Sequence, residues 1–194
     1  MQEAKTEPPT KKPKPKADTA TSTPGARKPN KAARPPFFTL QLAADEAWAQ
    51  FTNELTRTLA NLGEEESLNI TSGEDGYYVQ FTGRGSSGIR AEAVSNTFLE
   101  NHEKLSEQAC GRLLMLGWKV PTEDSPSYFL NAAPPVRYSA VASLAVFTFL
   151  VVFRASHPGE LQYKAWAKDG SFLQFPNLGI AAEAEGSDRR STSL

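Results

Sequence analysis

The sequence has 194 residues and a formal net charge of −1, so it has room for one domain with tails. The charge is uneven, because residues 1–36 carry a net of +6 from nine Lys/Arg and three Asp/Glu, which leaves −7 for the remainder. A single cysteine, Cys110, excludes an internal disulfide, and the proline-rich start lacks the apolar core of a secretory signal. We therefore expect a cytoplasmic protein.

Residues 1–36 are predicted to form a disordered arm. They contain eight of the fourteen prolines and no Val, Ile, Leu, Phe, Trp or Tyr. Such a segment buries too little apolar surface to offset ordering entropies of roughly 1–2 kcal/mol per residue. Its charge suits nucleic-acid phosphates or an anionic lipid surface, and the alternative interpretation is a solubilising linker. The predicted organisation is this arm, one α+β domain over 37–182 and a disordered tail over 183–194.

An amphipathic helix is predicted at the start of the domain. From Asp45 to Leu62 apolar residues recur at steps of three and four residues. Asp45 is the predicted N-cap, and Gly63 is the predicted stop.

Three short strands are predicted next, at residues 68–70, 77–81 and 89–93. Apolar and polar residues alternate in each run, and glycine-containing turns separate the runs. This pattern favours a three-stranded antiparallel meander with one apolar face against the first helix. The opposite face is mostly polar and carries Asn69, Tyr78, Gln80, Thr82, Arg90 and Glu92.

The second half of the domain is predicted to contain further helices and one or two further strands. A helix over Glu103–Leu116 ends at Gly117, and a short strand follows at Ser127–Asn131. A final strand at Leu161–Ala167 turns into Phe172–Phe175. Together these elements predict an α+β fold that begins with a helix and a meander.

The stretch Tyr138–Phe153 is the most apolar part of the chain. Its 16 residues are fewer than the roughly 20 that are needed to cross a bilayer. We expect a buried helix, or a helix shared with a second subunit. Residues 147–153 also have the composition of a strand, which is the alternative.

No pattern of catalytic or ligand-binding residues is evident. The glycines of Gly83–Gly88 match the spacing of a dinucleotide-binding loop, but a strand pattern follows them instead of the helix that such a loop needs. A hairpin loop is therefore predicted. The two histidines, His102 and His157, have no grouping that suits a metal, and no nucleophile motif is present. We predict no catalytic residue, no metal and no cofactor, and therefore a protein that is not an enzyme.

Four short motifs recur in the order of a known family. They are Tyr78–Phe81, Arg90–Asn96, Leu116–Trp118 with Pro121, and Pro158–Trp166. Over about residues 45–180 the series resembles the actinobacterial branch of the YbjN-like, type III secretion chaperone-like (TY-Chap) peptide-binding domains. The resemblance implies a helix–meander–helix α+β fold that is often dimeric. It also implies a non-enzymatic role as a chaperone or adaptor, for which a relation to secretion is expected.

A partner is expected on the polar face of the meander, because helices occupy the other face and peptides commonly bind sheet edges or apolar grooves. The predicted partners are a client protein or peptide and a second copy of the chain, with nucleic acid or an anionic surface at residues 1–36 as the alternative. Ordinary packing is the alternative for every candidate, and for Trp118 core packing is favoured. The candidate partner-binding residues are Tyr78, Gln80, Arg90, Glu92 and Trp118.

Overall fold

The protein is described by a computed structural model that covers residues 36–73 and 76–183, with side chains from residue 44 onward. The arm predicted before Pro36 and the tail predicted after Glu183 lie outside the described residues. The elements are α1 (Pro36–Ala60), β1 (Ser67–Ser72), β2 (Tyr77–Gly83), η1 (Gly85–Ser87), β3 (Ile89–Ala93), α2 (Glu107–Leu116), β4 (Tyr128–Ala132), α3 (Tyr138–Phe147), η2 (Thr148–Val152), η3 (Pro158–Glu160), β5 (Leu161–Trp166), η4 (Pro176–Leu178) and β6 (Ala181–Ala182).

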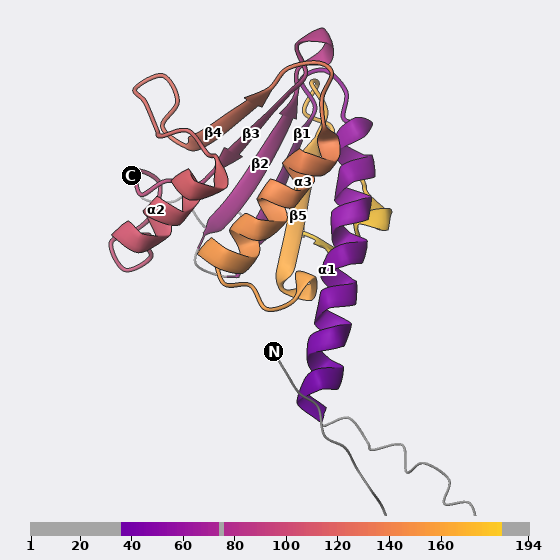
Figure 1. Ribbon diagram of the computed structural model, residues 1–194. Helices are drawn as coiled ribbons and strands as arrows, with labels where there is room; N and C mark the ends of the chain where they lie inside the picture. Colours follow the sequence, from indigo (N-terminus) through magenta and orange to yellow (C-terminus); the bar gives the residue numbers. More distant parts are fainter. Residues whose placement is uncertain (1–35, 74–75, 184–194) are drawn as a thin grey trace, which may run out of the picture. The chain divides into compact units, whose positions relative to one another are not determined.

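A six-stranded mixed sheet organises the fold, in the order β4-β3-β2-β1-β5-β6. Every neighbouring pair is antiparallel except β5 and β6, which run parallel. Figure 1 shows α1 and α3 lying over the same face of this sheet. The core lies between the helices and the alternating apolar side chains of the strands. The α+β prediction is confirmed, and so are the three meander strands.

Helix α1 is longer than the sequence pattern predicts. It begins at Pro36 and not at Asp45, so Asp45 lies inside the helix and the N-cap prediction is wrong. Proline is well tolerated in a first helical turn, and the Leu, Gln and Ala residues that follow are good helix formers. The predicted apolar stripe is buried as expected, through Trp48, Phe51, Leu55 and Leu59.

Helix α2 starts four residues later than predicted, at Glu107. Its N-cap is Ser106, whose Oγ accepts a hydrogen bond from the N–H of Ala109 at 3.2 Å. The preceding Leu105 is held outside the helix, because its N–H donates to Oδ1 of Asn96 at 2.7 Å and its carbonyl accepts from Nδ2 of Asn96 at 3.0 Å. The predicted stop is confirmed, since Gly117 has a left-handed backbone with φ of 106°.

The apolar stretch Tyr138–Phe153 forms a helix, so the strand alternative is wrong. It is α-helical through Phe147 and continues as a π-turn over Thr148–Val152. Arg154, a non-glycine residue with φ of 59°, stands two residues after the turn, and the N–H of Ala155 donates to the carbonyl of Phe149 at 3.0 Å. No helix among the described residues is both long and apolar enough to cross a membrane.

The late strands match the predictions only in part. The expected strand near Ser127 appears as β4, and β5 ends at Trp166. Instead of a full strand at Phe172–Phe175, Phe172 forms an isolated bridge with Trp166 before Pro176 begins the short helix η4. The two-residue strand β6 was not predicted, because two alanines carry no alternation.

Both edges of the sheet are partly occupied by other parts of the chain. Beside β4, Lys119 and Phe129 exchange two backbone hydrogen bonds of 2.9 and 3.2 Å. Beside β5, the parallel strand β6 pairs along the edge, and the N–H of Glu183 donates to the carbonyl of Tyr163 at 2.7 Å. Part of each edge is therefore already paired within the chain.

Candidate functional site

Four of the five predicted partner-binding residues lie together on the sheet face opposite α1 and α3, which we call the outer face. Gln80 of β2 pairs with Glu92 of β3, and Tyr78 lies two positions along β2 on the same side. Arg90 is two positions from Glu92. The predicted clustering of these four side chains is therefore present.

Arg90 is the centre of the outer-face contacts. Its Nη2 donates to Oε1 of Glu92 and to Oγ of Ser125, both at 2.9 Å. Its Nη1 donates to Oδ1 of Asn131 at 3.2 Å, and the guanidinium lies 4.8 Å from the ring centre of Phe129. Only 14% of the side chain is exposed. The charge of Arg90 is thus already satisfied within the chain.

Tyr78 and Trp118 are also engaged internally. The Tyr78 hydroxyl lies 3.2 Å from Oγ of Ser127, and burial raises the pKa of the Tyr78 phenol, with the negative charge of Glu92 adding to this rise. Trp118 is 3% exposed, and its Nε1 donates to Oγ1 of Thr148 at 2.9 Å. Its side chain belongs to the core, which was the favoured alternative for this residue.

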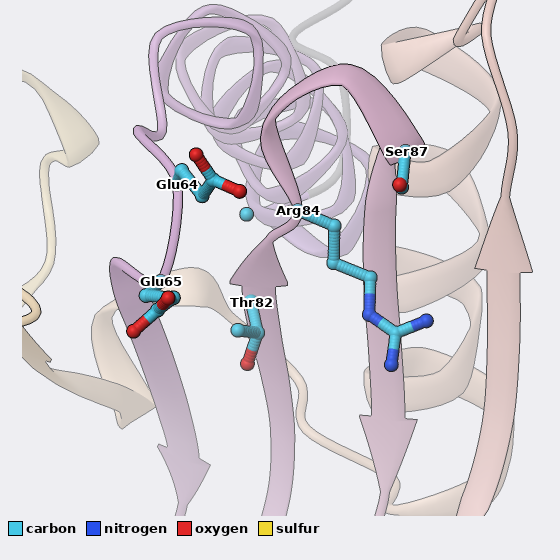
Figure 2. Close-up of a pocket in the computed structure, with 6 residues that line it drawn as sticks. Glu64, Glu65, Thr82, Arg84 and Ser87 are labelled. Atoms are coloured by element: carbon cyan, nitrogen blue, oxygen red, sulfur yellow. The ribbon is translucent and has the colours of Figure 1, made fainter.

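The loop Gly83–Gly88 is a hairpin connection, as predicted. A shallow pocket beside it is lined by Glu64, Glu65, Thr82, Gly83, Arg84 and Ser87 (Figure 2).

Several backbone N–H groups of this loop donate hydrogen bonds within the chain. Arg84 N–H donates to the carbonyl of Gly88, and Ser87 N–H donates to the carbonyl of Arg84, each at 2.9 Å. Figure 2 shows the Arg84 side chain extending along β3, away from Glu64 and Glu65. The strand β3, and not an α-helix, follows this loop, so it lacks the helix start at which a nucleotide phosphate binds.

His157 directly precedes the short helix η3. Nδ1 of His157 accepts from the N–H of Gly159 at 2.9 Å, so this ring caps a turn. Across residues 36–73 and 76–183, no group of three His, Cys, Asp or Glu residues is placed to hold a metal ion.

A surface that sequence reasoning missed lies where α2 packs against η2. Arg112 of α2 donates from Nη1 to the carbonyl of Val151 at 3.1 Å. Met115 is one turn after Arg112 on the same flank of α2, and Phe147 is one turn before Val151. Their exposed fractions are 88% for Met115, 52% for Phe147 and 40% for Val151. We call these four residues the α2–η2 seam.

The seam was not predicted, because the apolar stripe of the first of these helices was assigned to the core, and the stretch Tyr138–Phe153 was expected to be buried or shared with a second subunit. The one usable signal was Met115, which falls outside the predicted apolar stripe of Leu105, Ala109, Leu113 and Leu116. Phe147 and Val151 stand in a run that is apolar on every side, so the sequence does not show which side is exposed.

Comparison with known proteins identifies one family. The family model TY-Chap3 matches residues 41–167 of the chain. Its description is T3SS (YopN, CesT) and YbjN peptide-binding chaperone 3. No curated protein and no solved structure matches the chain. The match spans more than half of the sequence and agrees with the motif series from Tyr78 to Trp166, while the actinobacterial branch stays a prediction. Membership in a chaperone family points to a non-enzymatic protein. The chain belongs to the TY-Chap3 family of peptide-binding chaperones.

Proposed function

We propose that the chain is a non-enzymatic chaperone or adaptor that holds an unfolded or extended segment of a client protein. Membership in a peptide-binding chaperone family supports this proposal. The observation that carries it is the exposure of three apolar side chains, Met115, Phe147 and Val151, on the two helices that the Arg112 hydrogen bond joins. Single exposed apolar residues are ordinary on protein surfaces, whereas several gathered in one place commonly mark a contact site.

Two surfaces are candidates for the client. On the outer face, a client that recruited Arg90 or Tyr78 would first have to break hydrogen bonds to Glu92 and Ser127. At the α2–η2 seam, a client that contacts the exposed apolar side chains would displace only water. We therefore favour the seam. The outer face remains the alternative, through Tyr78, Gln80, Arg90 and Glu92.

The proposal extends to the setting of the client. The family description names type III secretion, so we propose a client that is kept unfolded for export. We also propose a cytoplasmic location, which the free thiol of Cys110 supports, because such thiols are stable in reducing compartments. A second copy of the chain is an alternative occupant of the α2–η2 seam.

Peptide binding by matched variants tests the proposal. The full chain is titrated with fluorescent peptides from unfolded proteins, and Met115→Gln with Phe147→Gln is expected to weaken binding at least about tenfold. Phe172→Gln is the control, because Phe172 is 51% exposed, close to the 52% of Phe147, and lies beside Lys164 of β5. This control is expected to bind like the unaltered chain.

Other outcomes would redirect or overturn the proposal. Loss of binding in Gln80→Ala, with full binding in the seam variant, would move the client to the outer face. A chain that binds no peptide, and that recovers no stoichiometric partner from its own cell, contradicts the chaperone function.

A second function rests on the net charge of +6 over residues 1–36. In this alternative the arm recruits the protein to nucleic acid or to an anionic membrane. Binding would then weaken steeply as salt rises, and it would disappear when residues 1–35 are removed. Equal binding with and without those residues would reject it.

A further inference from the structure

A cavity of about 430 Å³ lies where the start of α2 meets the end of η2. Three basic residues line it, namely Lys104, Arg112 and Arg154. Tyr77 and Phe153 line it as well, and their rings stack with centres 5.0 Å apart and planes 13° apart. The cavity thus combines positive charge with an apolar wall.

The positive charge of this cavity is not neutralised within the described part of the chain. Arg57, Arg90 and Lys168 each form an ion pair with a glutamate. In residues 36–73 and 76–183, Lys104, Arg112 and Arg154 form none. Although Glu103 and Glu107 are close in sequence, neither lines the cavity.

The position of Arg154 is unusual for an arginine. It follows the π-turn with φ of 59°, a left-handed conformation that helix ends normally give to glycine. A glycine would end this helix with less strain, but it would leave the cavity with two basic residues. The arginine therefore contributes charge where the backbone alone would favour a smaller residue.

The cavity adjoins the α2–η2 seam through Arg112, which lines the cavity and also donates to the carbonyl of Val151. A peptide that places one residue in the cavity can therefore place another on Met115 or Phe147. Residues 37–194 carry a net charge of −7, so this part of the chain repels a long polyanion. A single carboxylate beside apolar residues fits this combination better than a nucleic-acid strand.

We propose that the cavity binds the carboxylate of an acidic residue in the client peptide while the seam binds a neighbouring apolar residue. Charge-assisted hydrogen bonds from Lys104, Arg112 and Arg154 would hold the carboxylate. This assignment rests on the proposed chaperone function and adds the chemistry of the preferred client, which is an acidic and apolar segment.

The test compares two labelled peptides by fluorescence anisotropy with the full chain. One carries Asp or Glu between Leu and Phe residues, and the other carries Asn or Gln at those positions. The acidic peptide is expected to bind about fivefold or more tightly. Arg154→Gly is expected to remove most of this preference and leave the amide peptide unaffected, because glycine suits the backbone at that position. Arg137→Ala, which removes an exposed cation elsewhere, is the control and is expected to keep the preference.

The outcomes separate the cavity from the general function. If neither peptide nor any unfolded segment binds the unaltered chain, the proposed function is wrong. If peptides bind but Arg154→Gly and Lys104→Ala keep the full acidic preference, only the cavity assignment is wrong. Competition distinguishes the source of the anion. The assignment would be overturned if inorganic phosphate or a single-stranded oligonucleotide displaced the acidic peptide as effectively as unlabelled peptide does.

Discussion

The indole N–H of Trp118 donates a hydrogen bond to Oγ1 of Thr148 across 2.9 Å, and both side chains are buried. Thr148 in turn donates from Oγ1 to the carbonyl of Leu144 at 2.8 Å. The segment after α2 is thereby joined to the first residue of the π-turn η2. The position of α2 in the seam therefore depends on the position of η2.

Replacing Thr148 by valine should therefore destabilise the fold. Thr148→Val leaves the buried N–H of Trp118 without an acceptor, which is expected to lower the free energy of unfolding by about 1–3 kcal/mol. Urea unfolding measures the change. Thr52→Val is the control, since the Thr52 hydroxyl donates only to the carbonyl of Trp48 in its own helix. An equal effect of both substitutions would contradict the role given to the Trp118 contact.

Replacing Arg154 by glycine should stabilise the fold. Removing the strain of a left-handed non-glycine residue should raise the free energy of unfolding by about 1–2 kcal/mol. The greater conformational freedom of glycine in the unfolded chain should lower it by about 0.5–1 kcal/mol. A net gain of about 0.5–1 kcal/mol is expected in thermal or urea unfolding. Arg154→Ala removes the same charge but keeps a Cβ, so it should show no gain. If alanine stabilises as much as glycine, backbone strain is not the cause.

Two glycines should respond in opposite directions to alanine. A Cβ at Gly83 would collide with the carbonyl oxygen of Gly63, so Gly83→Ala is expected to cost about 2–3 kcal/mol. A Cβ at Gly111, inside α2, meets nothing within 4 Å. Gly111→Ala should therefore gain up to about 1 kcal/mol from helix propensity. Chemical denaturation of the two variants provides the check, and a stable Gly83→Ala protein would refute the close approach.

Alkaline pH should destabilise the protein through Tyr128. Burial, with a hydrogen bond to Cys110, raises the pKa of Tyr128 to about 12, above the ordinary value of 10.0. The folded state thus holds this proton more tightly than the unfolded state. The stabilisation is complete below about pH 10 and is lost as the pH rises toward 12.

Stability measured from pH 8 to 12 tests this prediction, with tyrosinate absorbance followed in parallel. Tyr128→Phe should show a smaller loss of stability above pH 10, and Cys110→Ala should lower the pKa of Tyr128 toward its ordinary value. A pH dependence that is unchanged in Tyr128→Phe would assign the alkaline loss to another group, such as Tyr78.

Regular patterns in the sequence predicted the sheet well, because its alternation is local. Successive side chains of a strand point to opposite faces, so the polarity of each residue in 77–81 indicates its face. The strand and the face of Tyr78 and Gln80 can therefore be predicted without knowledge of the partner strands. The start of α2 was not predicted correctly, because it depends on two hydrogen bonds between Asn96 and Leu105, which are nine residues apart. A local window contains no sign of that contact.

The candidate site was harder to predict than the fold, for a physical reason. The alternation of residues 89–93 placed Arg90 and Glu92 on the same face, but only the structure reveals that Ser125 and Asn131 also engage Arg90. Whether an apolar residue such as Phe147 is buried depends on which helix packs beside it. Similarly, Arg154 looks like an ordinary charged residue until its backbone conformation is known.

The occupied sheet edges restrict how a client can be recognised. A strand that added along all of β4 would have to displace Lys119, and one that added to β5 would have to displace β6. Backbone pairing accepts almost any sequence, because every residue offers the same N–H and C=O groups. Because that route is partly obstructed, we expect client side chains to contribute more to recognition. Selectivity among unfolded segments then becomes a property of their composition, and a proline within the recognised segment should be tolerated.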